Sequence, residues 1–196
     1  MRKIIILLVL LNSIGFACEK KGSQKIFYPD KTFPEVLIKT SMGDIVIELD
    51  RNRAPITVNN FLQYVESGAY KKTIFHRVEK GFVIQGGGYD EKYNDVVECD
   101  KIYNESGNGL RNTKGTIAMA RFDDPHSATT QFFINLKDSP SLDPNPKNWG
   151  YAVFGEVVEG MDVVEKIGNV RVGFSSGLNA ENVPNEPVTI HDVIVQ

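Results

Sequence analysis

The sequence predicts a mainly β domain, either a barrel or a sandwich, with two helices packed against it. Roughly seven or eight short apolar runs are separated by loops rich in Gly, Asn, Asp and Pro, which is typical of antiparallel β architectures. Two other stretches place apolar residues at helical spacing. The 196 residues are 41% hydrophobic and 24% charged, which suits one domain with a full core. Periodicity alone leaves the choice between barrel and sandwich open.

The domain is predicted to open with a hairpin and a helix. The apolar runs Glu35–Thr40 and Asp44–Leu49 flank a short glycine-containing turn, as in a β-hairpin. The next stretch has one apolar helical face between Pro55, which suits a first turn, and Gly68, which suits a helix end. The positions of that face are Val58, Phe61, Leu62 and Val65.

Further short strands, a second helix and a closing strand follow. The second helix is indicated by Met161, Val164 and Ile167, and it ends at Gly168. Gly155 lies inside one of the apolar runs and indicates a bulge. The runs predicted as strands are Phe75–Val78, Phe82–Gln85, Thr116–Ala120, Gln131–Leu136, Tyr151–Val158 and Val188–Val195.

Residues 1–17 have the layout of a secretory signal peptide. Two basic residues precede the apolar run Ile4–Leu11, and small residues follow it. The run is too short to cross a bilayer as a mature helix. The GFAC stretch resembles a bacterial lipoprotein lipobox, in which the cysteine is lipidated after cleavage, although Gly15 stands where leucine is usual. Cys18 is therefore predicted to carry a lipid, and conventional cleavage near Ala17 is the alternative.

The sequence contains only one other cysteine, Cys99. Two cysteines in an exported chain can form a disulfide, but a lipid on Cys18 would prevent that bridge. Because lipidation is the preferred interpretation, Cys99 is expected to stay a structural thiol.

Residues 18–34 are polar, rich in lysine and interrupted by prolines, and they lack hydrophobic periodicity. Such a composition predicts a flexible tether that lifts the domain from a membrane surface. The predicted organisation is therefore a signal peptide over residues 1–17, a lipid-anchored tether over 18–34 and a folded domain over 35–196.

Charge and composition exclude several functions. The formal net charge of −3 gives no basic surface for nucleic acid. No Cys and His spacing typical of a metal site occurs, and the glycine-rich stretch at 86–88 lacks the residues of a phosphate-binding loop. We therefore expect no metal, cofactor or nucleic-acid partner, and we expect a monomer.

One charged residue, Arg77, interrupts an apolar run. A guanidinium group is charged at physiological pH and is rarely buried without partners, so by itself Arg77 would be a solvent-facing strand residue. Two pairs of one amide and one aromatic residue accompany it on separate runs. Gln131 and Phe133 are two residues apart and share a face, whereas Phe82 and Gln85 need a bulge or a strand end to meet.

The stretch FHRVEKGFVIQGG around Arg77 resembles the signature of the cyclophilins, the cyclosporin-binding family of peptidyl-prolyl cis–trans isomerases. The similarity extends from about Val36 to the C-terminus through GDIVIELDRNRAPITVNNF, GTIAMAR, SATTQFFIN and YAVFGEVVEGMDVVEKI. The last three motifs resemble the bacterial, exported branch. The resemblance implies a closed eight-stranded antiparallel β-barrel, capped by a helix at each end, with the active site in a groove on its outer surface.

The resemblance also implies roles for individual residues. It makes Arg77 the catalytic residue. The residues implied to line the pocket for the substrate proline are Phe82, Val83, Phe133 and Leu142. Those implied to hydrogen-bond the peptide are Gln85, Gln131 and the backbone of Ala120 and Arg121. Two further residues implied at the site are His76, at its edge, and Tyr151, where many eukaryotic members have histidine.

The sequence departs from the family pattern at Ser141. Many members have tryptophan immediately before the leucine aligned here with Leu142, and bacterial members often have another aromatic residue. Trp149 lies in a loop that looks inserted and is not expected to replace it. The resemblance therefore implies that the missing aromatic residue weakens cyclosporin binding more than it weakens turnover.

The expected function is that of a peptidyl-prolyl isomerase acting on proline-containing polypeptides during the folding of exported or envelope proteins. The expected location is the bacterial cell envelope, through a lipid on Cys18. The alternative is a surface-tethered module or chaperone that holds proline peptides with little turnover. The presence of Arg77, the two glutamines and the two phenylalanines favours the enzyme, and Ser141 favours the alternative.

Overall fold

The computed structural model describes residues 25–196. The predicted signal peptide, Cys18 and the first part of the predicted tether lie outside this range. Eight strands of the described residues form a closed barrel: β1 (Glu35–Thr40), β2 (Gly43–Leu49), β3 (Thr73–Glu79), β4 (Val83–Asp90), β5 (Thr116–Met119), β6 (Phe132–Asn135), β7 (Val153–Glu159) and β10 (Thr189–Val195).

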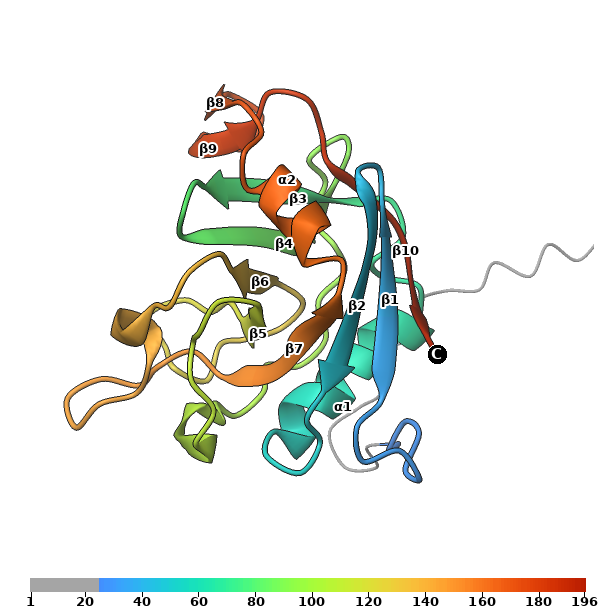
Figure 1. The fold of residues 1–196 in the computed structure, drawn as a ribbon, viewed down its shortest axis with the longest axis vertical. Coiled ribbons are helices and arrows are strands. Elements are labelled where there is room, and N and C mark those ends of the chain that lie inside the picture. Colours follow the sequence, from blue (N-terminus) through green and yellow to red (C-terminus); the bar gives the residue numbers. More distant parts are fainter. Residues whose placement is uncertain (1–24) are drawn as a thin grey trace, which may run out of the picture.

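The barrel is antiparallel throughout, with the strand order β1-β10-β3-β4-β6-β5-β7-β2. Figure 1 shows how β1 and β2 run side by side along one wall of the molecule. The closed barrel is confirmed, and the sandwich is excluded. Closure leaves no exposed sheet edge in the barrel.

A two-stranded sheet of β8 (Val172–Ser175) and β9 (Ala180–Pro184) lies outside the barrel order. The sequence did not predict it. Most of its residues are partly or fully exposed, so the hydrophobic alternation that marks a strand is missing. Asn182 also has a left-handed φ of 61°, which is unusual within a strand.

Two α-helices, α1 (Pro55–Glu66) and α2 (Met161–Ile167), pack near opposite ends of the barrel (Figure 1). The Phe61 ring of α1 lies 5.1–5.6 Å from the rings of Tyr70, Phe132 and Phe154, measured between centroids. Such aromatic contacts add to the burial energy of the apolar face. Two 3-10 turns complete the described structure: η1 (Ser106–Asn108) and η2 (Pro140–Leu142).

A side chain distant in sequence caps the start of α1. The residue before the helix, Ala54, has no side chain that can accept a hydrogen bond. The Glu105 carboxylate instead accepts from the backbone N–H groups of Ile56 at 3.2 Å and Thr57 at 2.8 Å. A carboxylate there satisfies free helix donors and interacts favourably with the helix dipole. The cap ties α1 to the loop that precedes β5.

Residues 25–34 differ from the predicted flexible tether, because they pack against the domain. Phe27 is 9% exposed and belongs to the core. Its N–H donates to Asn59 Oδ1 at 2.9 Å, and the Asn59 amide donates to the Lys25 carbonyl at 2.9 Å. Arg51 donates to the Phe27 carbonyl at 2.6 Å. A buried aromatic ring with satisfied backbone groups holds this segment in place. The prediction of a flexible tether therefore applies only to residues 18–24, which lie outside the described range.

Cys99 is disulfide-bonded, so the expectation of a structural thiol is wrong for this structure. Its backbone N–H donates to the Tyr64 hydroxyl at 2.7 Å, which ties this loop to α1. The expectation depended on a lipid at Cys18, the only other cysteine of the sequence, which lies outside the described residues. Within residues 25–196, no helix is long and apolar enough to cross a membrane.

Candidate active site

A β-bulge in β3 turns Arg77 to the outside of the barrel. Phe75 pairs with Gly86 and Arg77 pairs with Gln85, so His76 is an extra residue in β3 without a counterpart in β4. An extra residue reverses which side the following side chains face. Phe75 is therefore in the core, whereas the Arg77 side chain, two residues later, is 37% exposed. The register explains why a charge can stand inside an apolar run.

Arg77 belongs to a row of residues that crosses five neighbouring strands. Across β3, β4, β6, β5 and β7, the Cα partners are Arg77 with Gln85, Gln85 with Phe133, Phe133 with Ala118, and Ala118 with Val153. Directly paired residues place their side chains on the same face, and neighbouring strands are about 4.8 Å apart. The outer surface thus has a cation and an amide directly beside an apolar patch.

The apolar part of this surface is a cluster separate from the barrel core. Its buried members are Val83, Ala118, Phe133 and Val153, and its partly buried members are Phe82, Leu110, Ala120, Leu142 and Tyr151. All four residues predicted for the proline pocket are in the cluster. Phe82 joins it from the strand end, because it lies immediately before β4 and its N–H closes a turn onto the Glu79 carbonyl at 2.9 Å.

Sequence reasoning missed three members of the cluster: Leu110, Ala118 and Val153. For Ala118 the sequence carried a signal, because the run is continuously apolar from Ile117 to Met119. In the structure, every residue from Thr116 to Met119 is buried. A strand that is apolar on both faces is covered on both faces. Leu110 follows a turn residue and shows no such pattern.

Tyr151 and Arg121 form one wall of the surface. The Tyr151 ring meets the Phe133 ring edge to face, with centroids 5.6 Å apart. The Arg121 guanidinium lies 4.7 Å from the Tyr151 ring centroid, in a cation–π contact. Arg121 also donates to the carbonyl groups of Trp149 at 2.9 Å and Gly150 at 3.3 Å. Its side chain therefore fixes the loop before Tyr151, while its backbone remains the part predicted to meet a peptide.

A chain of polar side chains borders the apolar cluster. Arg77 Nη1 donates to Gln85 Oε1 at 3.3 Å, and Gln85 Nε2 donates to Gln131 Oε1 at 2.9 Å. Arg77 Nη2 forms an ion pair with the Glu79 carboxylate. Sequence reasoning missed Glu79, although its place two residues after Arg77 in an extended strand puts both side chains on one face. These contacts hold the guanidinium beside the apolar cluster.

The two glutamines also border a small hollow of about 90 Å³. Its lining includes Ala120, Arg121 and Phe122 beside Gln85 and Gln131. The two residues predicted to bind peptide through their backbone therefore lie next to the two amides. The neighbouring glycines at 86–88 lie within β4 and do not form a loop.

His76, predicted at the edge of the site, is almost fully buried, with an exposed fraction of 7%. Its ring meets Tyr89 edge to face at a centroid distance of 4.9 Å. Burial, together with the charge of Arg77, lowers the pKa of His76 to about 4. The imidazole is therefore neutral at physiological pH, and its Nδ1 atom has no hydrogen-bond partner within residues 25–196.

The departure at Ser141 is visible in the structure. Ser141 is exposed beside the partly buried Leu142 in η2. Trp149 packs edge to face on His126, with centroids 5.1 Å apart, and it is not a member of the apolar cluster. Neither Ser141 nor Trp149 therefore adds an aromatic ring to the apolar cluster beside Leu142.

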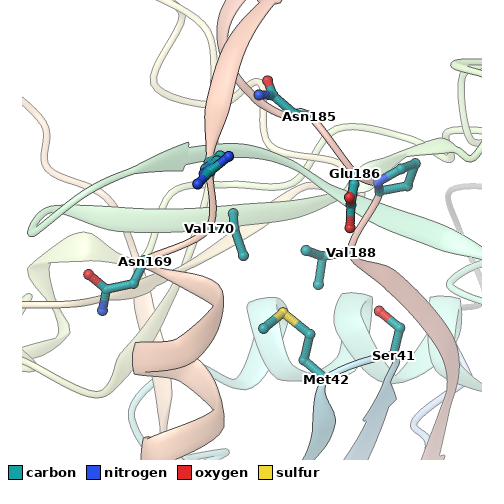
Figure 2. A pocket seen from close by; sticks show the side chains of 9 residues that line it. Ser41, Met42, Asn169, Val170, Asn185, Glu186 and Val188 are labelled. Carbon is teal, nitrogen blue, oxygen red and sulfur yellow. The ribbon is translucent and has the colours of Figure 1, made fainter.

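A larger hollow of about 770 Å³ lies elsewhere. Figure 2 shows it between Met42 at the β1–β2 turn, Val170 after α2 and Glu186 before β10. None of the predicted site residues lines it, so size does not locate the site. Among residues 25–196, no three His, Cys, Asp or Glu side chains gather in a way that could hold a metal ion.

Comparison with known proteins identifies the family of the chain. The family described as cyclophilin type peptidyl-prolyl cis-trans isomerase/CLD matches residues 35–195. The chain is 52% identical over 158 residues to peptidyl-prolyl cis-trans isomerase cyp18 of Streptomyces antibioticus, covering 79% of this chain and 94% of the relative. It is 50% identical over 163 residues to peptidyl-prolyl cis-trans isomerase B of Escherichia coli (strain K12), covering 82% and 98%.

Solved structures show the same fold. A cyclophilin type peptidyl-prolyl cis-trans isomerase from Cryptosporidium parvum aligns with a TM-score of 0.69 and 27% identity, over 84% of this chain and 98% of that one. Its structure in the presence of the dipeptide Ala-Pro aligns with a TM-score of 0.68 and 27% identity, over 83% and 98%. These similarities show that the chain belongs to the cyclophilin family and is a peptidyl-prolyl cis–trans isomerase.

Proposed function

We propose that Arg77 accelerates isomerisation by stabilising the twisted X–Pro amide. Rotation of a peptide bond breaks amide resonance and has a barrier of about 18–20 kcal/mol, so unaided X–Pro isomerisation takes roughly tens to hundreds of seconds. No covalent bond forms or breaks in this reaction. A site that stabilises the twisted amide is sufficient, without a nucleophile or an acid–base pair.

An arginine suits this task because the twisted amide differs electronically from the planar one. When resonance is lost, the proline nitrogen becomes pyramidal and gains a lone pair. A guanidinium N–H can donate to that lone pair, and this interaction is stronger in the transition state than in the ground state. Differential binding of this kind lowers the barrier.

The apolar cluster and the amides supply the fixed frame against which the bond turns. The cluster around Phe133 would hold the proline ring, while Gln85 and Gln131 would hydrogen-bond the flanking peptide. Holding one side of a rotating bond removes freedom that is not needed for the reaction. The observation that supports this proposal is the row from Arg77 through Gln85 to Phe133 on adjacent strands.

The test is isomerisation of a short X–Pro peptide by the wild-type chain and by the Arg77→Ala variant. We expect rapid turnover by the wild type and loss of most activity in the variant, with an unchanged circular dichroism spectrum. If the folded Arg77→Ala protein turned over the peptide at the wild-type rate, the assigned role of Arg77 would be refuted.

The same assay separates the enzyme from a peptide-holding module. The exposed Ser141 beside Leu142 favours the module, because it leaves the proline pocket without an aromatic residue at that position. Peptide binding in a titration, combined with no acceleration by the wild type, would identify the module. The Ala-Pro structure of the relative supports proline-containing peptides as ligands in either case.

For its setting, we propose that the enzyme assists the folding of exported or envelope proteins and is anchored by a lipid on Cys18. The support is the basic and apolar N-terminus followed by GFAC. A disulfide between Cys18 and Cys99 is the alternative to the anchor, because one sulfur cannot hold both a lipid and a disulfide. Mass spectrometry of the membrane-extracted protein decides: a lipid-modified Cys18 peptide supports the anchor, and a peptide joining the two cysteines excludes it.

A further inference from the structure

Arg77 and Glu79 lie next to each other on the outer face of β3. Arg77 is opposite Gln85 and Glu79 is opposite Val83, so the two residues are consecutive on this face of the strand. Alternate residues of a strand are about 6.5–7 Å apart, a distance that long charged side chains can close. The structure has Arg77 Nη2 and a Glu79 carboxylate oxygen in an ion pair.

The guanidinium is consequently held from two sides. Nη1 donates to Gln85 Oε1 at 3.3 Å, and Nη2 donates to Glu79. The Gln85 amide is itself fixed by its bond to Gln131 at 2.9 Å. Because the guanidinium is planar, two anchors on different nitrogens define the orientation of its plane. Its remaining N–H donors stay available to a substrate.

The ion pair lies in contact with solvent. The side chains of Arg77 and Glu79 are 37% and 41% exposed, so their pairing adds little to the stability of the fold. A flexible arginine side chain in open solvent would otherwise sample several rotamers and lose entropy when it binds the transition state. The effect of Glu79 should therefore be visible in catalysis more than in folding.

We infer that Glu79 is a positioning residue for the isomerisation: its carboxylate orients the Arg77 guanidinium toward the amide held at the apolar cluster. This inference rests on the proposed role of Arg77. It assigns Glu79 no contact with the substrate. The opposite role, in which Glu79 competes with the substrate for Arg77, predicts faster turnover when the carboxylate is removed.

The experiment measures kcat and KM of the full chain with a short X–Pro peptide for wild type, Glu79→Ala and Glu79→Gln. Glu79→Ala should lower kcat about fivefold, with KM nearly unchanged. This factor corresponds to the upper end of the interaction free energies of exposed ion pairs. Glu79→Gln should stay within about twofold of wild type, because its amide oxygen still accepts from Nη2. Glu159→Gln is the matched control, since it removes an exposed carboxylate from β7, which β4, β6 and β5 separate from β3.

A double variant separates this inference from the role of Arg77. Once Arg77 is alanine, adding Glu79→Ala should cause no further loss, because the guanidinium to be positioned is gone. If Arg77→Ala loses activity but Glu79→Ala matches or exceeds wild type, the positioning role fails and Arg77 stands. An equal loss in Glu79→Gln and Glu79→Ala also refutes hydrogen-bonded positioning. If Arg77→Ala keeps full activity, the proposed function itself fails.

Discussion

Gly88 and Gln131 meet so closely that a methyl group does not fit between them. A Cβ atom built at Gly88 would lie 2.7 Å from the Gln131 side-chain amide carbon, well inside van der Waals contact. The absent side chain on β4 thus leaves the room that the Gln131 amide occupies. In that place the amide accepts from Gln85.

The Gly88→Ala variant should therefore impair the site more than the fold. Gln131 is the flexible partner and would move away, which breaks its contact with Gln85. We expect kcat/KM for an X–Pro peptide to fall about fivefold, with a small change in melting temperature. Gly107→Ala is the control, because nothing lies within 4 Å of its added Cβ. Unchanged kcat/KM in Gly88→Ala would show that the position of Gln131 does not matter for turnover.

The Arg77→Lys variant tests whether charge alone is sufficient. An ammonium group keeps the charge but lacks the planar arrangement of donors. It cannot donate to Gln85 and Glu79 and still reach the proline nitrogen in the same geometry. We expect kcat/KM to fall by about a hundredfold or more, with an unchanged urea midpoint. Activity near the wild-type value would mean that a point charge is all the reaction needs.

The Glu105 cap predicts a stability effect without a catalytic one. Glu105→Ala removes the acceptor for the Ile56 and Thr57 backbone N–H groups and should lower the free energy of unfolding by about 1 kcal/mol. Glu105→Gln should lose less, since its amide oxygen still accepts. Urea denaturation measures both values, and equal stability of Glu105→Ala and wild type would contradict the cap.

His76 predicts a loss of stability in mild acid. Its pKa is lowered to about 4 by burial and by Arg77, against about 6.5 in an unfolded chain. Between these values the unfolded state binds more protons, so stability falls as pH decreases from about 6.5 to about 4, by up to roughly 3 kcal/mol. Urea titrations of wild type and His76→Gln at pH 7 and pH 4.5 isolate this contribution from that of the carboxylates. The same pH slope in both proteins would rule it out.

The side chain at position 141 is expected to affect cyclosporin binding more than turnover. Its side chain is exposed beside Leu142, so a larger ring can be added without overpacking a core. Ser141→Trp should bind cyclosporin about tenfold more tightly, as an added aromatic contact in a binding pocket can, with kcat/KM for an X–Pro peptide nearly unchanged. Calorimetric titration gives the affinity. Equal affinity in the two proteins would show that this position does not control the drug.

The pattern of apolar residues was sufficient for most of the elements. The predicted strand Glu35–Thr40 is observed with the same bounds, and α1 lies between the predicted start at Pro55 and stop at Gly68. β4 extends beyond the predicted Phe82–Gln85, because pairing with β3 carries the strand through glycines whose composition indicates a turn. Local composition predicts a helix or strand where apolar residues recur at the spacing of that element. It fails where hydrogen bonding to a neighbouring strand, and not an apolar pattern, makes the segment a strand.

By itself, the sequence determined the family, the β-rich core and the residue types of the site, because apolar periodicity and ordered motifs are written along the chain. Tertiary structure decided where those residues point. The outward direction of Arg77 depends on the bulge at His76, which exists only relative to β4. The contact of Gln85 with Gln131, 46 residues later, likewise depends on strand pairing. Register and long-range contacts are properties of two segments together, so neither segment's sequence specifies them alone.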